Sequence, residues 1–109
     1  MTYKHEVIFC IVNSGFADEV MTAARQFGAG GGTVVRARGT ANPHAEKLFN
    51  IAIQPEKEIV MILVDARIKD EILHALYKAV GLNTPGQGIA FSLPVESVVG
   101  LSNYSKFTE

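Results

Sequence analysis

The sequence has few of the features that would place the protein in a membrane or an oxidising compartment. Its 109 residues include no tryptophan and a single cysteine, Cys10. A single cysteine cannot form a disulfide within the chain. Its longest apolar runs, residues 7–12 and 59–64, fall well short of the roughly 20 residues that cross a bilayer. The N-terminal residues do not follow a signal-peptide pattern. We therefore expect a cytoplasmic protein.

The sequence also has no excess of positive charge. Ten lysines and arginines stand against 11 acidic residues, which gives a formal net charge of −1. A protein that binds nucleic acid generally needs a basic face to neutralise phosphates, so we expect no nucleic-acid partner. The length and the apolar content of 48% are typical of one globular domain, which we place at residues 1–109.

The hydrophobic pattern switches between the periods of strands and helices. Continuous or alternating apolar runs predict strands, and apolar residues spaced by three and four predict helices. The resulting order, strand-helix-strand-strand-helix-strand, is that of a ferredoxin-like βαββαβ sandwich, an α+β fold. The predicted strands cover residues 7–12, 33–38, 58–64 and 89–93; the helices cover 16–27 and 68–80; residues 49–53 could extend a hairpin, and 95–101 could add a short strand.

Four glycines between residues 28 and 32 precede a strand that carries Arg36 and Arg38. Glycine lets a ligand approach main-chain N–H groups, and arginine offers a two-pronged donor to phosphate or carboxylate. This pattern favours an anion site, although a tight turn with solvated arginines would have the same sequence. A second glycine loop, residues 82–88, precedes the last strand. We expect both loops at one end of the sheet but on opposite sides, which predicts a site shared between subunits.

Two familiar phosphate-binding motifs are excluded. A Walker loop needs a Gly-Lys pair, and the sequence contains none. A dinucleotide-binding fingerprint would need glycine where Thr33 stands. Both motifs also place the loop before a helix, whereas each glycine loop here follows one.

The two glycine loops, in their order and spacing, resemble those of the nitrogen-regulatory PII signalling family. The resemblance rests on residues 30–39, the strand at 59–64, the following helix and residues 84–91. It implies a homotrimer without enzymatic activity, adenine nucleotides (AMP, ADP or ATP) as regulatory ligands at the subunit clefts, and no obligatory cofactor. It also implies that a loop between strands 2 and 3 controls a membrane transporter or metabolic enzyme. The resemblance implies that the nucleotide-binding residues are Gly31, Gly32, Thr33, Arg38, Gly39, Gly86, Gln87 and Gly88. We add Arg36 as a substitute charge.

The sequence departs from the family at the positions of three phosphate-binding cations, where it has Ile89, Gly100 and Ser102. Arg36, Arg38 or Lys57 could supply substitute charge. The segment at 40–47 is short and lacks the family's modified tyrosine and the glutamine linked to 2-oxoglutarate and magnesium. We therefore expect a PII-like protein with an atypical mobile loop.

Other polar residues give weaker indications. His44 and Glu46 could chelate a metal, but a solvated loop fits them better, and we expect no metal site. We find no nucleophile with a neighbouring base, although two alternatives stay open. One is a small enzyme acting on a phosphate or acyl-phosphate ester, and the other is a purely structural oligomeriser.

Overall fold

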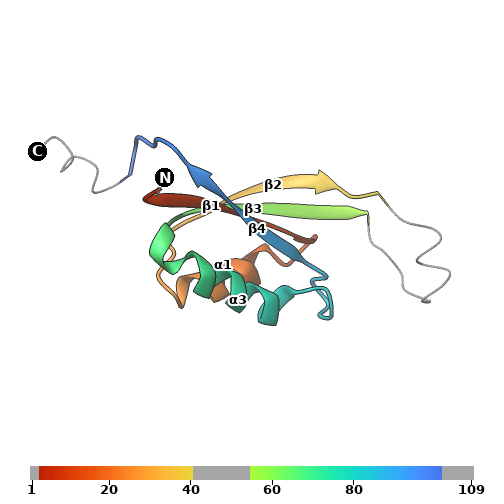
Figure 1. Cartoon of the computed structure of the whole chain (residues 1–109). Coiled ribbons are helices and arrows are strands. Elements are labelled where there is room, and N and C mark those ends of the chain that lie inside the picture. Colours follow the sequence, from red (N-terminus) through yellow and green to blue (C-terminus); the bar gives the residue numbers. More distant parts are fainter. Residues whose placement is uncertain (1–2, 41–54, 102–109) are drawn as a thin grey trace, which may run out of the picture.

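The computed structural model describes residues 3–40 and 55–101 and shows a two-layer sandwich, with a four-stranded sheet on one side and two helices on the other (Figure 1). The ferredoxin-like order expected from the sequence is confirmed. Residues 49–53, together with His44 and Glu46, lie outside the described residues. The elements are β1 (His5–Asn13), α1 (Ala17–Arg25), β2 (Thr33–Arg38), β3 (Glu56–Asp65), a short 3-10 turn (Ala66–Ile68), α3 (Lys69–Val80) and β4 (Ile89–Val95).

The sheet has the order β2-β3-β1-β4, and every neighbouring pair is antiparallel. The two central strands pair along their whole shared length, from His5 opposite Asp65 to Asn13 opposite Lys57. The edge strands are staggered, because β2 faces residues 56–61 of β3 whereas β4 faces residues 5–11 of β1. The two edge strands therefore overlap only alongside residues 9–11 of β1.

The core lies between the sheet and the helices. Alternate residues of the central strands point toward the helices and are buried, as the two-residue period of a strand requires. They pack against α1 and α3, which are amphipathic and turn their apolar stripes toward the sheet. The largest fully buried side chains are Ile8, Cys10, Val12, Val20, Val60, Ile62, Ile72, Leu76 and Val80.

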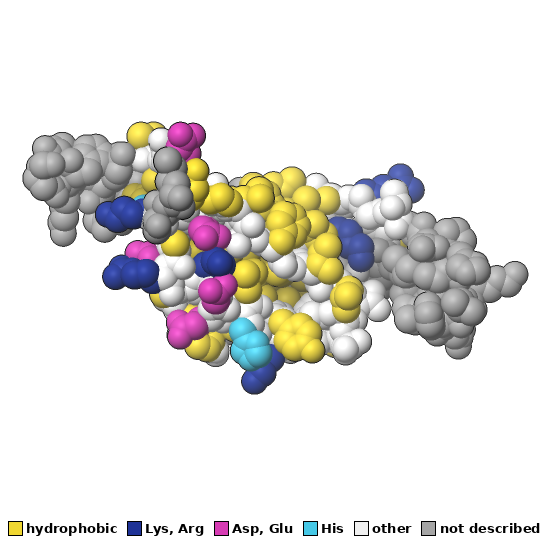
Figure 2. Space-filling view, viewed as in Figure 1, with side chains coloured by type: hydrophobic (Ala, Val, Ile, Leu, Met, Phe, Trp, Pro, Cys, Tyr) yellow, Lys and Arg dark blue, Asp and Glu magenta, His cyan; other side chains and the backbone are white. Residues whose placement is uncertain are grey.

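The other face of the sheet carries apolar side chains that nothing in the described chain covers. Phe91 on β4 stacks on Phe9 of β1, with ring centroids 5.4 Å apart, and still exposes 43% of its surface. Ile89 and Leu93 on the same face are about half exposed, at 50% and 49%. Figure 2 shows apolar side chains gathered along β4. The expectation that the central strands are covered on both faces is therefore wrong for a single chain.

β4 ends at Val95 and residues 96–101 form no strand, so the short extra strand predicted there is absent from the described residues. Gly81 is the C-terminal cap of α3, as predicted. A Cβ at this position would collide with the carbonyl oxygen of Tyr77, which explains the glycine. Among residues 3–40 and 55–101, no helix has the length and hydropathy needed to cross a membrane.

Candidate functional site

Polar groups converge where β1 and β2 end and where β3 and β4 begin, an end of the sheet that we call the loop end. At its centre is Asn13, the last residue of β1, which is only 5% exposed. Its Nδ2 donates to the carbonyl oxygen of Pro85 at 2.9 Å and to Oε1 of Gln87 at 3.3 Å. Its backbone N–H donates to the carbonyl oxygen of Gly86 at 2.9 Å. Asn13 thus fastens the second glycine loop to the sheet.

Lys57 brings a positive charge to the same cluster. Its Nζ donates to Oδ1 of Asn13 at 2.7 Å. Gly39, just beyond β2, passes close to this side chain, because a Cβ on Gly39 would lie 3.1 Å from Cε of Lys57. The backbone N–H of Gly39 donates to the carbonyl oxygen of Pro55 at 2.6 Å, which closes the base of the β2–β3 connection. The lysine that the sequence offered as a substitute cation therefore stands between two predicted site segments.

The second glycine loop is shaped by close packing against α3 and β1. A Cβ on Gly88 would lie 2.5 Å from the carbonyl oxygen of Val80 and 2.8 Å from Cγ1 of Val12, so no larger residue fits. Gln87 has a positive φ of 47°, which is uncommon for a residue with a side chain. Such a conformation persists where the surrounding structure fixes it, as the hydrogen bonds of Asn13 do here.

Arg36 and Arg38 lie on β2, next to this cluster but on the other face of the sheet. Their positions in the register are opposite Glu58 and Glu56, and both arginine side chains are exposed. They share the helix-bearing face with Val34, as the alternation predicted. Glu58 is already engaged, because its Oε1 accepts the backbone N–H groups of Gly15 and Ala17 at 3.1 and 3.2 Å.

The first glycine loop lies at the opposite end of the sheet, so the expectation that both loops share one end is wrong. Because β2 and β4 run in opposite directions, the loops that precede them begin at opposite ends. There a hollow of about 380 Å³ is lined by Val7, Gly31, Gly32, Thr33, Met61 and Leu63. The structure thus brings Gly39, Gly86, Gln87 and Gly88 to the loop end, with Arg36 and Arg38 beside them, and places Gly31, Gly32 and Thr33 elsewhere.

The glycines of the first loop differ in why a side chain is absent. At Gly32 a Cβ would lie 2.8 Å from Sδ of Met21 and 3.2 Å from the carbonyl oxygen of Met61, so the methionine side chain would have to shift to admit one. At Gly30 and Gly31 no heavy atom of the described residues lies within 4 Å of such a Cβ. Packing inside this part of the chain does not explain these two glycines. They leave backbone open to an approaching ligand or a second chain.

The remaining candidates do not form a second site. Residues 3–40 and 55–101 contain no group of three metal-ligating side chains. His74 is exposed on α3 and stacks on Tyr77, with ring centroids 6.3 Å apart. Burial raises the pKa of the Cys10 thiol to about 11, so this cysteine is a neutral core residue near pH 7.

Asn13 is the site residue that the sequence did not reveal. It precedes Ser14 and Gly15, and the three together have the composition of a turn. The useful signal was its place directly after a buried strand, where its amide can reach the loops of neighbouring elements. Its partners Pro85 and Gln87 lie 72 and 74 residues away, however, and no local sequence pattern predicts such contacts.

The element order and the strand order β2-β3-β1-β4 define a ferredoxin-like domain. Among solved structures, the chain is similar to PII from Arabidopsis thaliana bound to citrate, with a TM-score of 0.70 and 20% sequence identity. The match covers 94% of this chain and 84% of that one, and it confirms the fold. No family model matches the sequence. A search of curated proteins finds no match either.

Proposed function

We propose that the protein is a PII-like regulator that binds an adenine nucleotide, AMP, ADP or ATP, at clefts between the subunits of a homotrimer. The observation that carries the proposal is the cluster at the loop end, where Asn13 joins Lys57 to the second glycine loop beside Gly39. The ammonium group of Lys57 has three donors and uses one of them on Asn13, so it can also donate to a phosphate. The similar Arabidopsis protein holds citrate, which is also a small anion.

The separation of the two glycine loops supports a site shared between copies. One chain keeps Gly31 and Gly86 at opposite ends of its sheet, so a ligand that touches both loops needs two chains. The exposed backbone at Gly30 and Gly31 is available for this contact. The apolar open face of the sheet, with Ile89, Phe91 and Leu93, supplies the surface on which copies would associate.

Regulation would follow from different affinities of the nucleotide for two conformations of the protein. The connection between β2 and β3, residues 39–55, begins at Gly39 and ends two residues before Lys57, so a ligand at the loop end would lie beside both of its ends. We propose that a partner, either a membrane transporter or a metabolic enzyme, is controlled through this connection in the cytoplasm. This role requires binding without turnover.

Two measurements test the proposal. Light scattering gives the molar mass, and calorimetric titration gives the affinities for AMP, ADP and ATP. We expect Lys57→Ala to weaken nucleotide binding at least about tenfold, because a hydrogen bond to a charged group contributes roughly 1.5–3 kcal/mol. The matched control is Lys4→Ala, since Lys4 is exposed at the opposite end of the sheet, just before β1. This variant should bind like the wild type.

The outcomes separate the proposal from its alternatives. Absence of binding at millimolar nucleotide would overturn the nucleotide-regulator assignment. Binding that Lys57→Ala leaves unchanged would overturn the location of the site. Hydrolysis of the nucleotide or of an acyl phosphate would favour the alternative of a small ferredoxin-like enzyme.

A further inference from the structure

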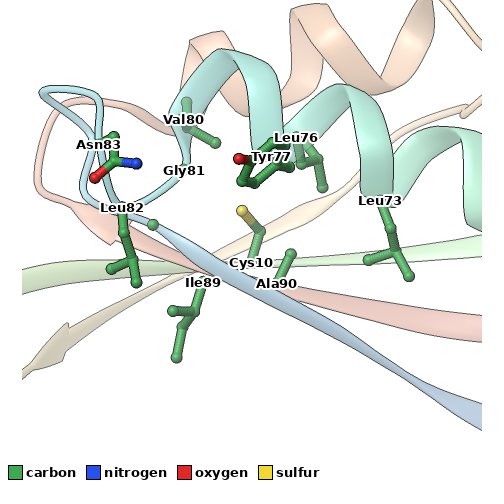
Figure 3. A pocket seen from close by; sticks show the side chains of 11 residues that line it. Cys10, Leu73, Leu76, Tyr77, Val80, Gly81, Leu82, Asn83, Ile89 and Ala90 are labelled. Atoms are coloured by element: carbon green, nitrogen blue, oxygen red, sulfur yellow. The ribbon is translucent and has the colours of Figure 1, made fainter.

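A pocket of about 360 Å³ opens between α3 and the edge strand β4, beside the second glycine loop (Figure 3). Helix α3 forms one wall, and the sheet and the loop form the others. Its lining residues are Cys10, Leu73, Leu76, Tyr77, Val80, Gly81, Leu82, Asn83, Gly88, Ile89 and Ala90.

The interior of the pocket is apolar. Figure 3 shows the sulfur of Cys10 and the methyl group of Ala90 pointing from the sheet toward α3, where Leu73 and Leu76 face them. Cys10 and Leu76 are each 1% exposed and form the deepest part of the lining. A ligand that entered would replace water mainly against the exposed lining side chains around this floor, Tyr77, Leu82 and Ile89.

Among residues 3–40 and 55–101, no charged side chain lines the pocket to compensate the cost of burying a charged ligand. The thiol of Cys10 is neutral near pH 7, because burial raises its pKa to about 11. Polar side chains are confined to Tyr77 and Asn83, both exposed, with Tyr77 67% exposed. An uncharged molecule could keep one polar group among them while its apolar part is buried.

Backbone contacts hold the frame of the pocket open. The N–H of Gly88 donates to the carbonyl oxygen of Val80 at 2.6 Å, and that of Gly81 donates to the carbonyl oxygen of Tyr77 at 3.1 Å. Both ends of the loop are thus tied to the last turn of α3. Asn13 also holds the middle of the loop, through Pro85 and Gly86. The loop therefore cannot move into the pocket without breaking these hydrogen bonds.

We propose that this pocket binds a small, uncharged, largely apolar molecule of one or two rings, with its polar group among Tyr77 and Asn83. The volume falls within the range of known small-molecule sites, about 300–1,000 Å³, and the mainly apolar lining with a few polar groups is typical of them. The pocket shares Gly88 with the loop-end cluster but not Asn13, Lys57 or Gly39, so binding there would not require a bound nucleotide.

Indole, which is uncharged and carries one N–H group, is a suitable probe. We expect indole at millimolar concentration to cause saturable amide shifts in the NMR spectrum of the wild-type protein at Gly81, Asn83, Gly88 and Ala90. Nuclear Overhauser contacts from indole to the methyl groups of Leu76 and Ala90 would place it inside the pocket. Shifts confined to other surfaces, or no saturable shift, would overturn the proposal, and neither result depends on a variant that folds.

A matched pair of variants tests the location. Ala90→Leu adds bulk inside the pocket and should weaken indole binding at least about tenfold, or 1.4 kcal/mol. Ser92→Leu makes a similar change two residues further along the same face of β4, outside the lining residues, and should leave binding unchanged. Equal affinities for the two variants would overturn the assignment of the pocket.

Discussion

At the scale of single residues, Asn13 links parts of the chain that are far apart in sequence. Its amide group donates twice and accepts once, and its three partners belong to β3 and to the second glycine loop. Buried polar groups need partners of this kind, because an unsatisfied one costs free energy. The position of Lys57 and the conformation of the loop therefore depend on the same side chain.

Asn13→Ala should destabilise the protein and also weaken anion binding at the loop end. The variant removes three side-chain hydrogen bonds and leaves the carbonyl oxygen of Pro85 without its donor, at an expected cost of about 2–3 kcal/mol in the free energy of unfolding. Urea denaturation measures this change. The control is Asn83→Ala, because Asn83 is exposed and makes no side-chain hydrogen bond within residues 3–40 and 55–101. Equal stabilities of the two variants would contradict the prediction.

At the scale of elements, the glycines of the two loops have different physical causes. Gly88 lies where β1, α3 and the loop meet, and it is buried. Gly31 is exposed, and the space around it is empty within the described chain. A glycine-rich sequence looks the same in both cases. Only the neighbours of each position distinguish a glycine required by packing from one that leaves room for another molecule.

Gly88→Ala should therefore affect mainly stability, and Gly31→Ala mainly binding or association. The first forces a methyl group against the carbonyl oxygen of Val80 and should lower the free energy of unfolding by about 1–3 kcal/mol or more, as overpacked cores do. The second should change stability by less than about 0.5 kcal/mol but weaken nucleotide binding or subunit association. Denaturation and calorimetry together measure both properties. A Gly31→Ala variant that behaves like the wild type in both would show that its open backbone has no function.

The sequence predicted the elements better than their surroundings. Strand β2 was predicted with its observed bounds, because its alternation and flanking glycines are local signals. The apolar runs of β1 and β3 suggested cover on both faces, yet the helices cover only one. Composition cannot tell whether a helix or another chain covers the second face. The two glycine loops lie at opposite ends of the sheet because β2 and β4 run in opposite directions in the order β2-β3-β1-β4, and a pattern of local signals does not show strand direction.

At the scale of the whole molecule, one face of the sheet is covered by helices and the other is exposed. The helices cover one face of the sheet, while Phe9, Phe91 and their neighbours form an apolar surface on the other. A surface of this kind on a small domain marks an interface. Together with the separated glycine loops, it favours an assembly in which neither the core nor the site is complete in one copy.

Phe91→Lys should disrupt this assembly. A lysine on the open face would bury its charge against the neighbouring copy, which costs several kcal/mol unless it is paired. Sedimentation velocity at micromolar concentration should then show a smaller species than the wild type. Tyr77→Lys is the control, because Tyr77 is 67% exposed on the helix layer. A variant at Phe91 that keeps the molar mass of the wild type would exclude the open face as the interface.

Association through the uncovered face of the sheet would link folding to the amount of protein present. When copies associate only in the folded state, association draws chains out of the unfolded population by mass action. The melting temperature then rises as the protein is concentrated and falls as it is diluted. The cell's production of this chain would thus set the heat tolerance of each molecule as well as the number of molecules.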